Sequence, residues 1–377
     1  MALKDVMQSY VDRGEVPGVI TGTVRGDDVE IGVHGWRTLG TIDMAGHEMR
    51  RDTIIRIASM SRPIAAAAAM ALVEDGILDL DGPIEDFIPE FVYQQVLRDP
   101  TGPLDDTVPA DRPITLRDVL TYRSGFGFDP AVPFDAPIMR EALRLSVGIA
   151  PPKTQEPLDL DEWLARLATL PLMSQPGTRW AYQTPGTVLG ALLSRAAGQD
   201  VEVVLREQIL DPLGMSDTSF AVPPEKLDRL ATAYRYEDDH PVVADPSGPS
   251  SLWAAPPPFP DAGGDLVSTV DDYLTFARML RDGGSGILSP ESVALMTTQH
   301  LTPDQQAFEP DEGWGFGMSV TRSGPHAGRY TWNGGLGTLW FNDPRADLIA
   351  ILLTQRALDS PAARPIDTDF TTQVYAR

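Results

Sequence analysis

The sequence contains no cysteine, and only three of its 30 basic residues are lysine (Lys4, Lys153 and Lys226). The absence of cysteine excludes disulfides, thiolate metal sites and a cysteine nucleophile. No run of about twenty apolar residues occurs, so no transmembrane helix is expected. Residues 1–14 have the pattern of an amphipathic helix and lack the charged start and apolar stretch of a signal peptide. We therefore expect a cytoplasmic protein.

Positive charge is also scarce, because 54 acidic residues outnumber the basic ones and the formal net charge is −24. Nucleic acids and anionic membranes need a basic footprint, so neither is expected as a partner. The simplest interpretation is a solvated acidic surface that favours solubility. The five histidines have no pair at metal-ligand spacing, and no phosphate-binding glycine pattern occurs. We expect no metal and no organic cofactor, and the oligomeric state stays open.

The 377 residues have 42% hydrophobic and 22% charged content, which is typical of a globular protein with one two-lobed body or two domains. β-rich runs open and close the chain, while helical patterns dominate its middle. This order predicts an α/β (α+β) fold, in which an antiparallel sheet from both termini is flanked by helices and a helical lobe is inserted.

The same pattern suggests boundaries. We expect residues 1–84 and 265–377 to form the sheet domain and residues 85–264 to form the mainly helical lobe. A proline- and acid-rich stretch at about 127–160 is predicted to be a lid-like insertion. Residues 237–264 are expected to form a long loop rich in proline and aspartate.

A serine stands at the entry to the most apolar helix of the chain. Residues 62–74 are nearly all helix formers and apolar on every side, so this helix is expected to be buried. Free backbone N–H groups and the positive end of the helix dipole would lie beside Ser59. Ser59 and Arg62 are three residues apart and can share one helical face. Taken alone, the segment has a plainer interpretation, in which Ser59 or Ser61 only caps the helix.

Two later segments bring further polar groups. Tyr182 lies on a predicted loop before a helix expected at 187–197, where its hydroxyl can point into a cleft or simply pack at the surface. The Trp-Asn-Gly-Gly run at 332–335 precedes a β-rich run, and paired glycines at a strand edge let a ligand approach backbone N–H groups. A tight hairpin turn explains these glycines equally well. His326, shortly before this run, is expected to lie in a surface turn.

The three segments, in this order, resemble the signatures of the serine β-lactamase and penicillin-binding-protein superfamily, which are S-x-x-K, a tyrosine loop, and K-T-G or an equivalent. The flanking sequences resemble that superfamily as well. The stretch 115–126 is similar to "ITLRDLLTHTSGL", 176–182 to "PGTRWxY", 210–218 to "PLGMxDT" and 263–269 to "GGGLxST". The tryptophan-containing replacement of K-T-G is similar to the form in family VIII carboxylesterases and lovastatin-type acyltransferases. The resemblance extends from the first predicted hairpin to Gln355 and implies a β-lactamase/transpeptidase-like fold.

The resemblance also implies roles for individual residues. Ser59 would attack a carbonyl and form an acyl-enzyme, with Tyr182 as the general base. The backbone N–H groups of Ser59 and Gly335 would form the oxyanion hole. The substrate-binding residues implied are Trp332, Asn333, Gly334, Thr184 and Phe126. The implied function is that of a serine hydrolase or acyltransferase that acts on a small-molecule ester or amide, nearer to the esterases than to true β-lactamases.

Arg62 departs from the superfamily pattern, which has lysine at this position. A buried lysine can lose its proton, whereas an arginine stays protonated. In one interpretation Arg62 is a fixed charge that favours ionisation of Tyr182, with reduced or altered activity. In the other, catalysis is impaired, and the cleft binds a small carbonyl compound or a partner, or serves a different reaction. Thr184 stands where β-lactamases carry asparagine, which argues against efficient turnover of β-lactams.

Overall fold

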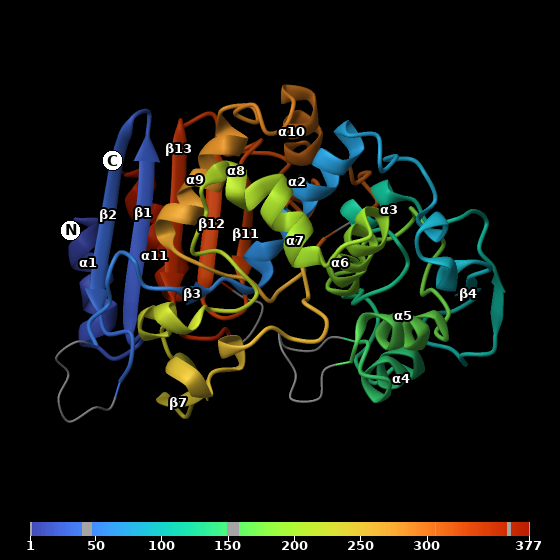
Figure 1. Cartoon of the computed structure of the whole chain (residues 1–377), viewed down its shortest axis with the longest axis horizontal. Coiled ribbons are helices and arrows are strands. Elements are labelled where there is room, and N and C mark those ends of the chain that lie inside the picture. The colour runs from blue at the N-terminus through green and yellow to red at the C-terminus, as the bar shows by residue number, and fades with distance from the viewer. Residues whose placement is uncertain (1, 40–46, 149–157, 306, 360–362, 377) are drawn as a thin grey trace.

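A seven-stranded antiparallel sheet, assembled from both ends of the chain, forms one side of the molecule (Figure 1). The computed structural model describes residues 2–39, 47–148, 158–305, 307–359 and 363–376. The strand order is β2-β1-β13-β12-β11-β10-β9. These strands span Gly18–Arg25 (β1), Asp28–Gly35 (β2), Glu312–Trp314 (β9), Ser319–Thr321 (β10), Tyr330–Gly334 (β11), Thr338–Asp343 (β12) and Leu348–Thr354 (β13). The prediction of an antiparallel sheet from both termini is confirmed.

Helices cover both faces of this sheet, and a group of helices extends beside it (Figure 1). The α-helices span Leu3–Asp12 (α1), Ser61–Glu74 (α2), Leu116–Leu120 (α3), Pro137–Arg144 (α4), Leu160–Ala168 (α5), Thr184–Ala197 (α6), Val201–Leu205 (α7), Asp211–Leu213 (α8), Val270–Arg281 (α9), Pro290–Thr297 (α10) and Pro365–Tyr375 (α11). Short two-stranded pairs join Ile55–Arg56 (β3) to Val267–Ser268 (β8), Gln95–Leu97 (β4) to Thr107–Pro109 (β5) and Ala233–Glu237 (β6) to His240–Asp245 (β7). No helix in these described ranges has the length and apolar character needed to cross a bilayer.

Strand β13 shows why the sheet is buried on both sides. All seven of its residues are buried, and successive side chains point to opposite faces. Leu348, Ala350 and Leu352 pack with α1 and α11, whereas Ile349 and Ile351 belong to the core that contains α2 and α9. The two termini of the chain are therefore held together on one face of the sheet.

Helix α2 lies in the interior, as its composition predicts. Every residue from Ser61 to Leu72 is buried, and the run of alanines lets neighbouring elements approach closely. The helix contacts α6 of the helical lobe and α10 beside the sheet. Helix α2 thus packs against both the helices beside the sheet and the helices that cover it.

The boundaries expected for the helical lobe stay a prediction. Helices α3 to α6 belong to the group of helices beside the sheet (Figure 1), and the predicted insertion at 127–160 falls among them. Its described part includes α4 and the start of α5, while residues 149–157 lie outside the described residues. Helix α6 begins at Thr184, three residues earlier than expected, because Pro185 in the first turn has a backbone that suits a helix start.

The prediction of a loop throughout 237–264 was wrong in its first part. Strands β6 and β7 form a hairpin there, and the turn residues Asp238 and Asp239 have φ of 48° and 62°. Aspartate tolerates this left-handed region, and a two-residue hairpin turn requires it. Most residues of β7 are exposed, so the strand lacks the apolar alternation that would have revealed it.

Candidate active site

Ser59 lies in a single 3₁₀ turn, Ala58–Met60 (η1), which leads directly into α2. Neither Ser59 nor Ser61 caps the helix, since Met60 occupies the cap position without a side-chain bond. Ser61 Oγ donates to the Ala58 carbonyl at 2.6 Å and accepts from the Leu266 N–H at 3.2 Å. Ser59 is half-buried. The capping interpretation is therefore wrong, and the N–H groups at the start of α2 are not used by either hydroxyl.

Three residues in or near the segments of the predicted site have an unusual backbone conformation. Ala58, Tyr122 and Gln183 have φ of 45°, 59° and 75°, in a region that residues other than glycine rarely adopt. Such conformations persist only where surrounding contacts hold them, and they concentrate at functional sites. The three residues come from segments far apart in the sequence, and Arg62 brings two of them, Tyr122 and Gln183, together.

Arg62, one turn after Ser59, connects these segments. Its side chain is 1% exposed. Nη1 donates to Tyr122 Oη at 2.9 Å and to the Gln183 carbonyl at 3.1 Å, and Nη2 donates to Gln183 Oε1 at 2.7 Å. The guanidinium carbon lies 4.4 Å from the centroid of the Tyr182 ring. Arg62 therefore contacts the face of the Tyr182 ring and donates hydrogen bonds to the next residue, Gln183.

The charges around Arg62 keep it ionised. Burial alone would lower the pKa of Arg62, but Tyr122, Tyr182 and Asp261 outweigh this effect, and the pKa lies above its ordinary value. Burial raises the pKa of Tyr122 despite the adjacent cation. Burial also raises the pKa of Asp261, against the opposing effect of Arg62 and the Gly263 N–H. The site thus contains a permanent cation, and Arg62 cannot exchange a proton.

Gln183 is the centre of a γ-turn. Its φ and ψ are 75° and −79°, and the Thr184 N–H bonds the Tyr182 carbonyl at 3.1 Å. This turn is the sharp step from the Tyr182 loop into α6. A side chain at Gly186 would come within 2.3 Å of Arg62 Nη1, so glycine is required for the guanidinium to fit.

Strand β11 completes the arrangement and contacts η1. Trp332 Nε1 donates to Tyr182 Oη at 2.8 Å. A Cβ at Gly334 would lie 2.2 Å from the Ile57 carbonyl, whereas a Cβ at Gly335 would have no neighbour within 4 Å. Gly334 therefore allows β11 to approach the serine turn, and Gly335 is exposed beside it. Through these contacts the structure brings together Ser59, Arg62, Tyr182 and the 332–335 run.

Phe126 and Thr184 lie in a different setting. Each is 4% exposed, and they line an apolar pocket with Ile138 and Met139 of α4 and Leu167 of α5. Neither Ser59 nor Tyr182 lines this pocket. Asn333, by contrast, is half-buried on β11 between Trp332 and Gly334. A direct contact of Phe126 or Thr184 with substrate stays a prediction.

Three residues of this site were not found from the sequence: Tyr122, Gln183 and Asp261. Tyr122 and Gln183 stand inside or beside the motifs that carry the resemblance, but no spacing rule indicates that they would bond one guanidinium. Asp261 lies in the stretch interpreted as a long loop. Their roles depend on contacts between residues more than fifty positions apart.

His326 does not enter the site. Its Nδ1 lies 2.9 Å from Asp343 Oδ2, and its ring lies 4.1 Å from that of Tyr375 on α11. Over the described ranges, no three histidine, aspartate or glutamate side chains converge as a metal site.

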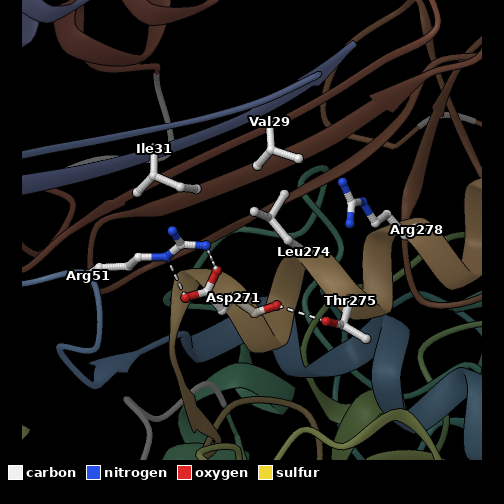
Figure 2. A pocket seen from close by; sticks show the side chains of 7 residues that line it. All are labelled: Val29, Ile31, Arg51, Asp271, Leu274, Thr275 and Arg278. Atoms are coloured by element: carbon white, nitrogen blue, oxygen red, sulfur yellow. Dashed lines mark hydrogen bonds and ion pairs between the residues drawn. The ribbon is translucent and has the colours of Figure 1, made fainter. Parts of the chain in front are cut away.

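A pocket on the sheet side of the molecule lies between the edge strand β2 and helix α9 (Figure 2). Val29, Ile31 and Leu274 supply its apolar wall. Arg51 pairs with both carboxylate oxygens of Asp271, at 2.7 and 2.8 Å. None of the predicted site residues lines this pocket.

A sheet built from both termini, a serine at the start of a buried helix and a tyrosine loop opposite a strand edge define the penicillin-binding and β-lactamase class of folds. The chain belongs to the Beta-lactamase family, whose sequence profile matches residues 3–370.

Known relatives include enzymes that act on acyl groups. Protein Rv1367c of Mycobacterium tuberculosis is 39% identical over 374 residues, covering 94% of this chain and 89% of the relative. Esterase EstB of Burkholderia gladioli is 33% identical over 360 residues, covering 88% and 85%. The solved structure of EstCE1, a hydrolase with promiscuous acyltransferase activity, has a TM-score of 0.83 and 27% identity, covering 99% of this chain and 97% of its own. The resemblance inferred from the sequence, to the esterase and acyltransferase members of the superfamily, is confirmed.

Proposed function

We propose that the protein is a serine hydrolase that cleaves carboxylic esters through an acyl-enzyme on Ser59, and that the same intermediate can pass its acyl group to an alcohol. The observation that carries the proposal is the position of Tyr182. Its hydroxyl is held by Trp332 at 2.8 Å, and its ring lies on the Arg62 guanidinium, one helical turn from Ser59. The identity to Esterase EstB supports an ester as the substrate, and the identity to EstCE1, a hydrolase with acyltransferase activity, supports acyl transfer.

In the proposed reaction Tyr182 takes the proton of Ser59 Oγ as this oxygen attacks the ester carbonyl. The carbonyl oxygen becomes an oxyanion and accepts hydrogen bonds from the backbone N–H groups of Ser59 and Gly335. Tyr182 then gives the proton to the alcohol oxygen, the carbon–oxygen bond breaks, and the alcohol leaves. Water, or an acceptor alcohol, repeats the steps in reverse and releases the acyl group.

A tyrosine can serve as the base only if its phenolate is stabilised. In this proposal two groups stand beside that phenolate: the Trp332 N–H is directed at Oη, and the Arg62 guanidinium lies at the ring face. We assign Arg62 no proton transfer. It is a positioning residue, because it holds the strained Gln183 turn that carries Tyr182.

The second candidate function is binding without catalysis. It is favoured by one observation, that the lysine of the superfamily is replaced by a cation that cannot act as a base. Under this alternative, Ser59 would never be acylated.

The test is hydrolysis of 4-nitrophenyl acetate, combined with intact-mass measurement of an acetyl adduct. The proposal expects nitrophenol release above the uncatalysed rate, and a mass increase of one acetyl group that is absent in Ser59→Ala. Tyr182→Phe is expected to lower kcat by roughly a hundred-fold or more, the contribution of a general base. Catalysed release that is unchanged in Ser59→Ala would refute the acyl-enzyme, whereas release at the uncatalysed rate without an adduct would favour the binding alternative.

A further inference from the structure

Aromatic rings form a continuous row from the ring of Tyr182 to the surface. Phe308 contacts both site rings, with centroids 5.4 Å from Tyr182 and 6.3 Å from Trp332. Phe128 lies 6.4 Å beyond Phe308, and Phe134 stacks on Phe128 at 4.9 Å with an interplanar angle of 18°. We call Phe308, Phe128 and Phe134 the aromatic row.

The row is attached to the site by the backbone. Phe128 and Tyr182 exchange two hydrogen bonds, with Phe128 N–H to Tyr182 carbonyl at 2.8 Å and Tyr182 N–H to Phe128 carbonyl at 2.7 Å. A substituent at Gly127 would come within 2.3 Å of the Tyr182 carbonyl, so this pairing depends on glycine. The backbone hydrogen bonds therefore fix the position of Phe128 relative to Tyr182.

Exposure increases along the row. Trp332 is 6% exposed, Phe308 and Phe128 are half-buried, and Phe134 is 61% exposed. The exposed Phe134 side chain contributes little to the stability of the fold, because most of its surface stays in water. Stacked in line with two other rings, it offers a surface to an apolar ligand.

Each phenylalanine of the row is followed directly by an acid: Asp129, Asp135 and Glu309. Arg179 neutralises Asp129 at 2.7 Å, while Asp135 and Glu309 are exposed. The cation of the site, Arg62, is buried and already bonded to Tyr122 and Gln183. The surroundings of the row thus disfavour a negatively charged ligand.

We infer that the aromatic row binds the alcohol portion of the ester, and that this portion is a bulky aromatic or alicyclic group without negative charge. The inference rests on the proposed function, in which Tyr182 Oη contacts the alcohol oxygen when it delivers the proton. The group attached to that oxygen then lies beside Phe308, the ring that contacts Tyr182 and Trp332. The acyl carbon, bonded to Ser59, lies on the other side of the alcohol oxygen.

The test uses two acetates that form the same acetyl-enzyme, ethyl acetate and 2-naphthylmethyl acetate, with release of acetic acid followed in a pH-stat. The measured quantity is the ratio of kcat/KM for the naphthylmethyl ester to that for the ethyl ester. Phe134→Ser is expected to lower this ratio about five-fold, the size of one aromatic contact. Tyr93→Ser is the matched control, because Tyr93 is 91% exposed and lies outside the row. It should leave the ratio unchanged.

Other outcomes decide as clearly. A ratio that is the same in Phe134→Ser and in the wild type overturns the inference. A second comparison places the naphthyl group on the acyl side, with ethyl 2-naphthylacetate measured against ethyl acetate. If Phe134→Ser lowers kcat/KM for this ester but not for 2-naphthylmethyl acetate, the row binds the acyl portion and the inference is overturned. A 6-carboxy-2-naphthylmethyl acetate that is hydrolysed as well as the uncharged ester overturns the assignment of charge.

If neither acetate is hydrolysed, the proposed function fails, and the row is tested separately by binding. Quenching of tryptophan fluorescence by 2-naphthylmethanol is then measured in the wild type, Phe134→Ser and Tyr93→Ser. Weaker binding in Phe134→Ser alone supports the row as a site for an aromatic alcohol. Equal binding in all three proteins, or none in any, overturns it.

Discussion

Arg62 differs chemically from the lysine of the superfamily pattern that it replaces. A lysine at this position is a compact cation that can release its proton, whereas the guanidinium is planar and permanently charged. Here it spans Tyr122 and both oxygens of Gln183 from a single buried position. The side chain is a structural link between α2 and the tyrosine loop, and in the proposed function Tyr182 is the group that moves protons.

Arg62→Lys is therefore expected to lower kcat/KM for 4-nitrophenyl acetate by roughly ten-fold or more, because one ammonium cannot replace the planar pair of donors that orients the Gln183 turn. Steady-state kinetics, with circular dichroism to confirm folding, measure the effect. Gln183→Glu is the companion variant, since it keeps an acceptor at Oε1 and should retain more activity than Gln183→Ala. Equal or faster turnover in Arg62→Lys would show that the arginine has no positioning role.

At the scale of elements, the site depends on how closely β11 approaches the serine turn. Thr338 Oγ1 donates to the Ile57 carbonyl at 3.1 Å, and the same carbonyl lies where a side chain at Gly334 would be. The neighbouring Gly335 faces open space. The two adjacent glycines therefore differ: a side chain at Gly334 would clash with the serine turn, whereas a side chain at Gly335 would meet no neighbour.

Gly334→Ala is expected to destabilise the protein by about 1–3 kcal/mol, the usual cost of forcing extra volume into a packed site. Thermal unfolding measures this as a lower Tm. Gly335→Ala is the matched control, because its methyl group meets no neighbour, and its Tm should stay near that of the wild type. A Gly334→Ala protein as stable as the control would mean that β11 and the serine turn can separate without cost.

The whole molecule carries a net charge of −24, and this charge acts on stability over its entire surface. Many arginines pair with acids at the surface, but such exposed pairs contribute little individually. Repulsion among the excess carboxylates opposes the compact state and is screened by salt.

The Tm is accordingly expected to rise by several degrees between 20 mM and 300 mM sodium chloride at pH 7, as measured by scanning calorimetry. A series with sodium and potassium chloride at equal ionic strength separates screening from specific ion binding. A Tm that falls with added salt would show that exposed ion pairs such as Arg50–Asp52 outweigh the net repulsion.

The sequence by itself determined the class of fold and the positions of the three motifs. Periodicity distinguishes strands at both ends from the apolar helix at 61–74, and short motifs depend on local residue order, which sequence preserves. The hairpin at 233–245 was not predicted, because its exposed second strand has no alternation of apolar and polar residues.

Only the tertiary structure decided what Arg62 does and which residues surround Tyr182. The bonds from Arg62 to Tyr122 and Gln183 join residues 60 and 121 positions apart, and the row from Tyr182 to Phe134 includes Phe308 from near the other end of the chain. Such contacts follow from how α2, β11 and the lobe pack together. Packing is set by the combined shape of many side chains, so no local pattern in the sequence records it.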